Sequence, residues 1–190
     1  MAEFQIRAAT KEDMPGVERI NRHYVLNTVI TFATEPKTVE QFVRQFDEIA
    51  RDGLPYIVAV EPNSADVLGY ANAHAFRDVS SAYKYTVEIS LFCANGQTGR
   101  GIGSKLLKAL IDALKEPLKH PELRAQGAHI PPRPVKQALA VMAVDETAKR
   151  NGLALKEFYE SFGFRCNGHL RQVGYKFDRW IDTMYLQLSL

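Results

Sequence analysis

The segment CANGQTGRGIGSKLL at residues 93–107 limits the possible folds more than any other part of this 190-residue chain. It places four glycines and one arginine between an apolar run and a helix-like pattern. A glycine inside a regular element costs roughly 0.5–1 kcal/mol relative to alanine, so this density of glycines needs a reason. We infer a backbone that approaches a ligand closely, where a strand ends and a helix begins.

The ligand favoured at such a junction is an anion. The first N–H groups of a helix have no partner within it, and the helix dipole adds roughly half a positive charge there. A pyrophosphate group suits these conditions. The spacing differs from the Walker A loop, which needs Lys and Ser or Thr after its second glycine, and from the G-x-G-x-x-G dinucleotide fingerprint. A glycine-rich turn without any ligand is the alternative.

Periodicity in the rest of the chain predicts that strands alternate with helices. Strands are expected at residues 4–8, 56–60, 67–75, 85–93 and 138–144, with further strand material at 175–188. Helices are expected to begin near Thr10, at Thr38, at Gly101 and at Ala154. This order predicts one domain over residues 1–190, of the α/β class (α+β in some classifications), with a mixed central sheet flanked by helices.

Residues 115–137 form a proline-rich stretch with little periodicity. We expect a long surface insertion that follows the helix of the glycine loop. Loops of this length usually have a functional reason or are disordered. A mobile insertion is one interpretation, and a lid or a dimer contact is the alternative.

Charge and composition exclude several classes of protein. The net charge of +2 is too small for a nucleic-acid scaffold, and two cysteines, Cys93 and Cys166, make no secreted disulfide framework. The first residues, MAEFQIRAATKED, lack the apolar region of a signal peptide, and no apolar run approaches the roughly 18 residues of a membrane span. The five histidines show no metal-ligand spacing. We therefore expect a cytoplasmic protein with no metal, no nucleic-acid partner and no membrane contact.

The strand that leads into the glycine loop carries a candidate catalytic carboxylate. Side chains alternate along a strand, so Thr86, Glu88 and Ser90 share one face. This strand should lie centrally with both faces covered, where a carboxylate is costly unless it is paired or opens into a cleft. Glu88 is therefore a site candidate, and a solvated glutamate on an edge strand is the alternative.

The motif QTGRGIGSKLLKAL resembles the acetyl-CoA loop of the GNAT acetyltransferases, whose pattern is Gln/Arg-x-x-Gly-x-Gly/Ala. The segments AYKYTVE and GYKFDRW are similar to the phosphinothricin N-acetyltransferase branch of that superfamily, and the likeness covers nearly the whole chain except residues 115–137. The resemblance implies the GNAT fold, acetyl-CoA as co-substrate and direct acetyl transfer to an amine in a ternary complex. It also implies a homodimer.

The resemblance further implies which residues bind the coenzyme. The loop amides would hold the pyrophosphate, and the backbone of residues 91–93 would pair with the pantetheine arm like an added strand. The implied coenzyme-binding residues are Leu91, Phe92, Cys93, Thr98, Gly99, Arg100, Gly101, Ile102, Gly103, Ser104 and Asn151. Thr98 stands where the family has Gln or Arg, and an ordinary helix cap is the alternative role for Asn151.

Two residues are implied in catalysis. Glu88 would be the general base, although a free glutamate pKa near 4.3 lies far below an α-amine pKa near 8, so partial burial and a bridging water are expected. Tyr159, in FYESFGF, would lie beside the departing thiolate, where this branch commonly has histidine. A phenol pKa of about 10 exceeds a thiol pKa of about 8.5, which favours a hydrogen bond over full proton transfer. A purely packing role is the alternative for Tyr159.

The acceptor substrate is predicted from matching positions in the same branch. These positions are Phe32, Tyr83, Thr86 and Lys176, and Arg77 is added as the cation nearest to Tyr83. The basic residues that the branch has before the tyrosine are replaced by Asp78 and Ser80, and phosphinate recognition needs paired charges. We therefore expect a small amino acid, or an analogue such as methionine sulfone or sulfoximine, more readily than phosphinothricin. Another amine (polyamine, aminoglycoside or protein N-terminus) and a non-catalytic acetyl-CoA sensor are the alternatives.

Overall fold

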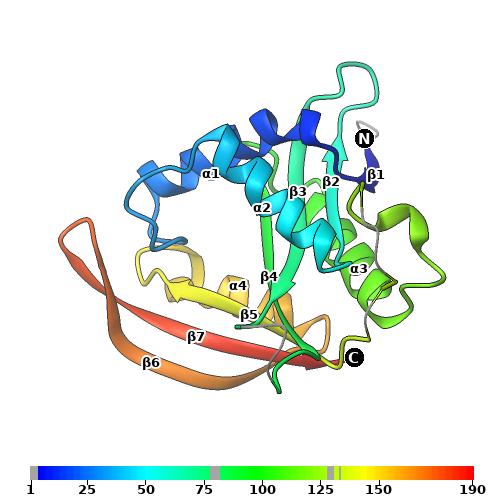
Figure 1. Ribbon diagram of the computed structural model, residues 1–190. Coiled ribbons are helices and arrows are strands. Elements are labelled where there is room, and N and C mark those ends of the chain that lie inside the picture. The colour runs from blue at the N-terminus through cyan, green and yellow to red at the C-terminus, as the bar shows by residue number, and fades with distance from the viewer. Residues whose placement is uncertain (1–3, 78–81, 128–130, 133) are drawn as a thin grey trace.

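The computed structural model describes residues 4–77, 82–127, 131–132 and 134–190. Asp78 and Ser80 lie outside these described residues. The described strands form one sheet in the order β1-β2-β3-β4-β5-β7-β6 (Figure 1). The strands are β1 (Gln5–Ala8), β2 (Tyr56–Val60), β3 (Val67–Ala75), β4 (Thr86–Cys93), β5 (Gln137–Val144), β6 (Arg165–Lys176) and β7 (Arg179–Ser189). The α-helices are α1 (Met14–Asn27), α2 (Val39–Arg51), α3 (Ile102–Lys115) and α4 (Ala154–Glu160).

The sheet is mixed, as expected, because β4 and β5 run parallel while the other neighbouring strands run antiparallel. The helices α1 and α2 cover one face of the β1–β4 half, and α3 covers the other face (Figure 1). Two neighbouring residues of β3 show that these helices lie on opposite faces of the sheet. The Tyr70 hydroxyl accepts a hydrogen bond from Asn21 of α1, whereas a Cβ placed on Gly69 would lie 3.1 Å from Leu106 of α3.

Local sequence signals account for the helix starts. Thr38 and Gln41 form a reciprocal capping box at the start of α2, and the apolar stripe of Phe42, Phe46 and Ile49 is buried against the sheet. At α3, Gly101 is the cap residue, with a φ of +79°. Glycine adopts this left-handed conformation without the steric cost that a β-carbon brings.

The two central strands separate part of the way along their length. β4 pairs with β5 only over Thr86–Ile89, opposite Gln137–Ala140. Beyond that point β4 remains paired with β3 as far as Cys93, and β5 remains paired with β7 as far as Val144. The pairing of β4 with β5 thus ends at Ile89, and the sheet opens in its middle. The candidate active site lies at this opening.

The C-terminal hairpin is longer than the sequence predicted. Strand material was expected only at 175–188, but β6 begins at Arg165 and a two-residue turn at Phe177 and Asp178 joins it to β7. Register shifts fall between Cys166 and Gly168 and between Leu170 and Gly174. Such bulges break the two-residue alternation by which a strand is recognised in sequence.

The proline-rich stretch packs partly into the body of the protein. Leu123, Ala125 and Val135 are buried, and Arg124 forms a β-bridge with Pro55. The described part therefore packs against β1 and α3. Residues 128–130 and 133 lie outside the described residues. Within the described ranges, no helix combines the length and the apolar character needed to cross a bilayer.

Candidate active site

The glycine loop ends in an exposed helix start. Gly99 and Gly101 have φ values of +82° and +79°, and a Cβ added to either would meet no atom within 4 Å. The first helical hydrogen bond runs from the Lys105 N–H to the Gly101 carbonyl, so the amides of residues 102–104 have no partner within α3. Amides without a partner inside the helix, a helix dipole and open space form a site suited to an anion.

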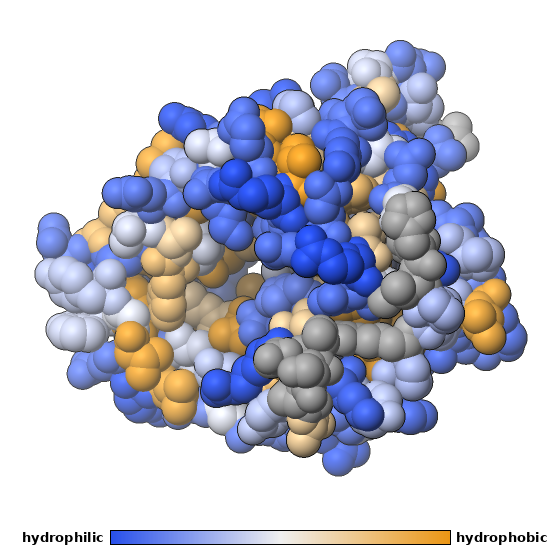
Figure 2. Space-filling view, in the orientation of Figure 1, coloured by the Kyte–Doolittle hydropathy of each residue, from blue (hydrophilic) through white to orange (hydrophobic). Residues whose placement is uncertain are grey.

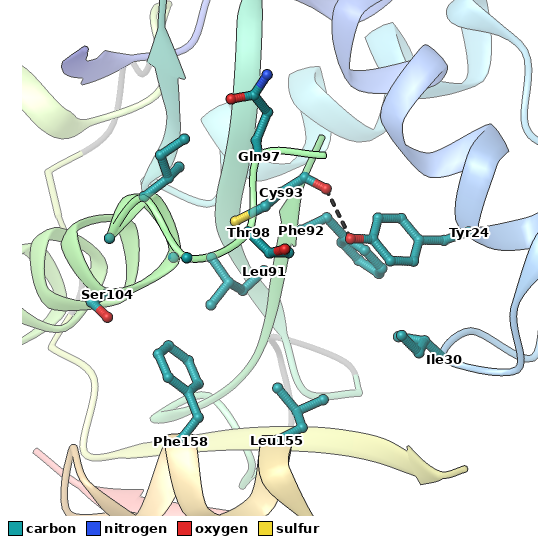
Figure 3. Close-up of a pocket in the computed structure, with 14 residues that line it drawn as sticks. Tyr24, Ile30, Leu91, Phe92, Cys93, Gln97, Thr98, Ser104, Leu155 and Phe158 are labelled. Carbon is teal, nitrogen blue, oxygen red and sulfur yellow. Dashed lines mark hydrogen bonds between the residues drawn. The ribbon is translucent and has the colours of Figure 1, made fainter. Parts of the chain in front are cut away.

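A cavity of about 480 Å³ lies against this helix start (Figure 3). Nine of the eleven predicted coenzyme residues line it: Leu91, Phe92, Cys93, Thr98, Gly99, Gly101, Ile102, Gly103 and Ser104. Five further lining residues were not predicted, namely Tyr24, Ile30, Gln97, Leu155 and Phe158. Gln97 belongs to the loop itself, and the fold brings the other four to it from α1, the segment that follows α1, and α4.

Two of the predicted coenzyme residues lie elsewhere. The Arg100 guanidinium bonds to the Gln97 side chain and does not line the cavity. Asn151 has a φ of +54° in a short 3₁₀ segment and lines a separate cavity with His169 and Asp182. The geometry therefore groups Asn151 with the middle of the hairpin and not with the glycine loop.

Tyr24 fixes the end of β4 beside this cavity. Its hydroxyl donates a 2.9 Å hydrogen bond to the Cys93 carbonyl, and its ring packs against Phe92 (Figure 3). In the sequence Tyr24 appears only as one more apolar position of a helix. Its bond to a strand 69 residues away explains why helical spacing could not identify it.

A second cavity of about 450 Å³ fills the gap between β4 and β5. Glu88, Tyr159 and Phe32, three of the predicted catalytic and substrate residues, line it. It shares four lining residues with the first cavity: Ile30, Leu91, Phe92 and Leu155. The two cavities are therefore neighbours along β4, and we call the second one the transfer cleft. Figure 2 shows the recess on this side of the molecule, between α1 and the hairpin.

Glu88 faces this cleft beside a histidine that sequence reasoning missed. The side chains of Glu88 and His74 are about one-third exposed, and Glu88 Oε1 lies 4.0 Å from His74 Nε2. The two residues are register partners on β3 and β4. Burial lowers the pKa of His74, and the charge of Glu88 opposes this only in part. His74 is thus neutral at neutral pH.

Tyr159 lies in the wall of the cleft with only 6% of its surface exposed. Its ring packs edge-on against Phe158 and Phe164. Burial raises the pKa of Tyr159 well above its ordinary value, and the nearby Cys93 thiol adds to the effect. The phenol therefore stays protonated, so it can donate a hydrogen bond to a charge that develops in the cleft.

The other predicted substrate residues do not line the cleft. The Arg77 guanidinium packs over the rings of Phe76 and Tyr83, outside both cavities. Thr86 lies at the start of β4, before the strands separate. Of the predicted substrate residues, only Phe32 lines the transfer cleft together with Glu88.

Lys176 has a structural contact in place of the predicted substrate contact. Its ammonium is buried and donates a 2.8 Å hydrogen bond to the Thr31 carbonyl, and burial lowers its pKa. The nearby Gly174 makes room for Phe32, because a Cβ there would lie 2.5 Å from the Phe32 ring. Lys176 and Gly174 thus attach the hairpin to the segment that carries Phe32 into the cleft.

The arrangement has no metal centre among the described residues, where no three His, Cys, Asp or Glu side chains converge. It has instead a mixed sheet that opens at its centre, an anion site at a helix start, and a carboxylate and a phenol in the adjoining cleft. This combination is typical of an acyltransferase. Residues 6–129 match the family model of the acetyltransferase (GNAT) domain. The chain therefore belongs to the GNAT acetyltransferase family.

Known proteins similar to this chain extend the comparison over its whole length. It is 35% identical to the phosphinothricin N-acetyltransferase of Streptomyces coelicolor, over all of this chain and 98% of the relative. It is 32% identical to the L-methionine sulfoximine/L-methionine sulfone acetyltransferase of Pseudomonas aeruginosa, over 97% of this chain and 94% of the relative. A phosphinothricin acetyltransferase from Sinorhizobium meliloti, solved in complex with AcCoA, superposes with a TM-score of 0.77 at 29% identity, covering 100% of this chain and 89% of that one.

Proposed function

We propose that this N-acetyltransferase moves the acetyl group of acetyl-CoA directly to the α-amine of a small amino acid or an analogue of the methionine sulfoximine, methionine sulfone or phosphinothricin type. The observation that carries the proposal is the continuity of the two cavities along β4, with the glycine loop in one and Glu88 in the other. The names of the relatives support the acceptor class.

The residues present fit acetyl-CoA. The amides of residues 102–104, which have no partner within α3, would hold its pyrophosphate, and the edge of β4 beyond Ile89 would pair with its pantetheine arm. When bound, acetyl-CoA supplies an acetyl thioester that is activated toward attack by an amine. Apolar side chains of both cavities, among them Leu91 and Leu155, exclude water from the thioester.

Glu88 removes the proton that the amine must lose. An ammonium has no lone pair, so only the neutral amine attacks the thioester carbonyl. Glu88 takes the proton directly or through a water, and the partial exposure of its side chain lets the proton pass on to solvent. Most of the rate gain comes from holding the amine and the thioester together at the shared wall of the two cavities.

Tyr159 stabilises the departing thiolate by donating a hydrogen bond. Tyr159→Phe removes only the hydroxyl, so the aromatic packing survives. We expect kcat to fall by about tenfold, the size of one hydrogen bond to a charged group, with the thermal stability nearly unchanged. Steady-state kinetics together with a melting curve measure both quantities. An unchanged kcat would leave Tyr159 with its packing role alone.

The acceptor class is tested by a thiol-release assay with acetyl-CoA across a panel of amines. The panel contains methionine sulfoximine, methionine sulfone, phosphinothricin and ordinary amino acids, and adds a polyamine, an aminoglycoside and a peptide with a free N-terminus. Turnover confined to the amino acids and analogues is the expected result. Turnover confined to the last three amines would overturn the acceptor class. Coenzyme binding without turnover of any amine would indicate a sensor.

We also propose that the enzyme works in the cytoplasm as a homodimer. The hairpin presents apolar side chains to solvent, and its edge strand β6 ends the sheet. Figure 2 shows part of this apolar surface in orange. The exposed apolar residues are Leu170, Val173, Tyr175, Phe177 and Trp180. A surface of this kind favours a second copy of the chain as its partner.

Sedimentation of the purified chain tests the dimer. We expect a dimer in the micromolar range, and a monomer when Phe177 and Trp180 are both replaced by aspartate, because two charges would then enter an apolar interface. Leu118→Asp is the matched control, since Leu118 is 83% exposed and lies outside the hairpin. A wild-type monomer, or equal dissociation by the control, would contradict the proposal.

A further inference from the structure

A third cavity, of about 270 Å³, lies on the side of the sheet that carries Glu88. It shares Thr31, Ser90 and Phe92 with the transfer cleft, so it opens from the cleft beneath α1 and α2. Unlike the cleft, it is lined largely by polar side chains. These are Asn21, Lys37, Gln45, Tyr70, Asn72 and His74.

Two atoms of this wall are buried without a hydrogen-bond partner. They are Asn72 Oδ1 and His74 Nδ1, and Asn72 as a whole is only 2% exposed. Buried polar atoms are nearly always paired, because leaving one unpaired is costly. Both atoms belong to residues that line the same cavity. They therefore point to a ligand that carries hydrogen-bonding groups into it.

The position of the third cavity relative to Glu88 indicates which ligand it binds. His74 lies between the two spaces, since its Nε2 is 4.0 Å from Glu88 and its side chain lines the third cavity. An amino acid whose α-amine is beside Glu88 can extend its side chain past His74 toward Asn72. The opposite wall of the cleft is apolar at Val141, Met142 and Leu155, and suits the acetyl and pantetheine groups.

We propose that the third cavity binds the side chain of the acceptor, and that Asn72 selects an uncharged side chain with an N–H or O–H donor, such as a carboxamide or a sulfoximine. This inference rests on the proposed function. The Asn72 carbonyl oxygen accepts a hydrogen bond and disfavours an anionic group. The Lys37 ammonium at the rim, which also bonds to Gln45, disfavours a cationic one.

Methionine sulfoximine and methionine sulfone provide the sharpest test, because they differ only by an N–H in place of an oxygen. We expect kcat/KM to favour the sulfoximine by about tenfold, as one hydrogen bond to a buried acceptor allows. Asn72→Leu should bring this ratio close to one. Asn72→Asp, which keeps an acceptor oxygen, should keep the preference. The ratio is taken within each variant, so a change in the folded fraction does not affect it.

Asn167→Leu, the same substitution at an exposed asparagine of β6, is the control and should leave the ratio unchanged. Turnover of both acceptors with an unchanged ratio in Asn72→Leu would overturn the inference alone. A wild-type preference for the sulfone would also overturn it. Acetyl-CoA binding without turnover of any amino acid would overturn the proposed function, and this inference with it.

Discussion

Glu88→Gln is expected to lower kcat for acetyl transfer by about 10²–10⁴-fold, the usual contribution of a general base. Glutamine keeps the shape of the side chain and its place opposite His74 on the neighbouring strand. Acetyl-CoA binding should be nearly unchanged, because Glu88 lines the transfer cleft and not the cavity of the glycine loop. Initial rates and coenzyme affinity, measured on the same preparation, separate the two effects.

The pH dependence makes this prediction specific to proton removal. The fraction of neutral amine rises as the pH approaches the α-amine pKa of about 8, so the variant should recover activity relative to wild type as the pH rises. Glu40→Gln, at an exposed position in the first turn of α2, is the matched control and should retain wild-type rates. Near-normal turnover by Glu88→Gln at neutral pH would contradict the general-base role.

Gly101→Val is expected to weaken acetyl-CoA binding by about 10²-fold. Valine is strained at a φ of +79°, and its side chain would enter the open space beside the first amides of α3. Either the start of α3 shifts, or the valine side chain occupies the space that the coenzyme phosphates need. Calorimetric titration with acetyl-CoA measures the loss directly.

Gly127→Val gives this prediction a matched control. Gly127 also has a positive φ, of +87°, and a Cβ there would meet no atom within 4 Å, but it lies outside the coenzyme cavity. Both variants carry a similar backbone strain, so both should lower the melting temperature. Only Gly101→Val should change the affinity for acetyl-CoA. Equal affinities in the two variants would contradict the assignment of the loop.

Local sequence patterns predicted the parts of the fold that depend on interactions between residues close together in the sequence. The expected strands at 56–60 and 67–75 have those bounds in the structure, and Thr38 caps α2 as its sequence indicates. The glycine loop lies between a strand and a helix because its glycines can adopt positive φ angles. Irregular elements were missed, since the bulges of β6 remove the alternation on which the prediction depends.

The parts of the site that were missed depend on tertiary contacts. His74 faces Glu88 only because β3 and β4 pair in one particular register. Tyr24 reaches the Cys93 carbonyl only because α1 crosses the end of β4. Conversely, Lys176 lies at a position matching a family substrate residue, yet its ammonium holds the Thr31 carbonyl. The spacing of residues along the sequence does not reveal these contacts.

In the proposed reaction, acetyl passes directly from the coenzyme to the amine. The Cys93 thiol lines the coenzyme cavity and could offer another route, through an acetylated enzyme. Burial raises the pKa of Cys93, despite the bond that its sulfur accepts from the Gly103 N–H, so the thiol is a poor nucleophile at neutral pH.

Intact-protein mass spectrometry after incubation with acetyl-CoA alone, and then with methionine sulfoximine, tests this claim most directly. We expect an unmodified protein in both samples, with N-acetylated amino acid only in the second. An acetyl group on Cys93 that disappears when the amino acid is added would contradict it, because the acetyl group would then pass through the enzyme.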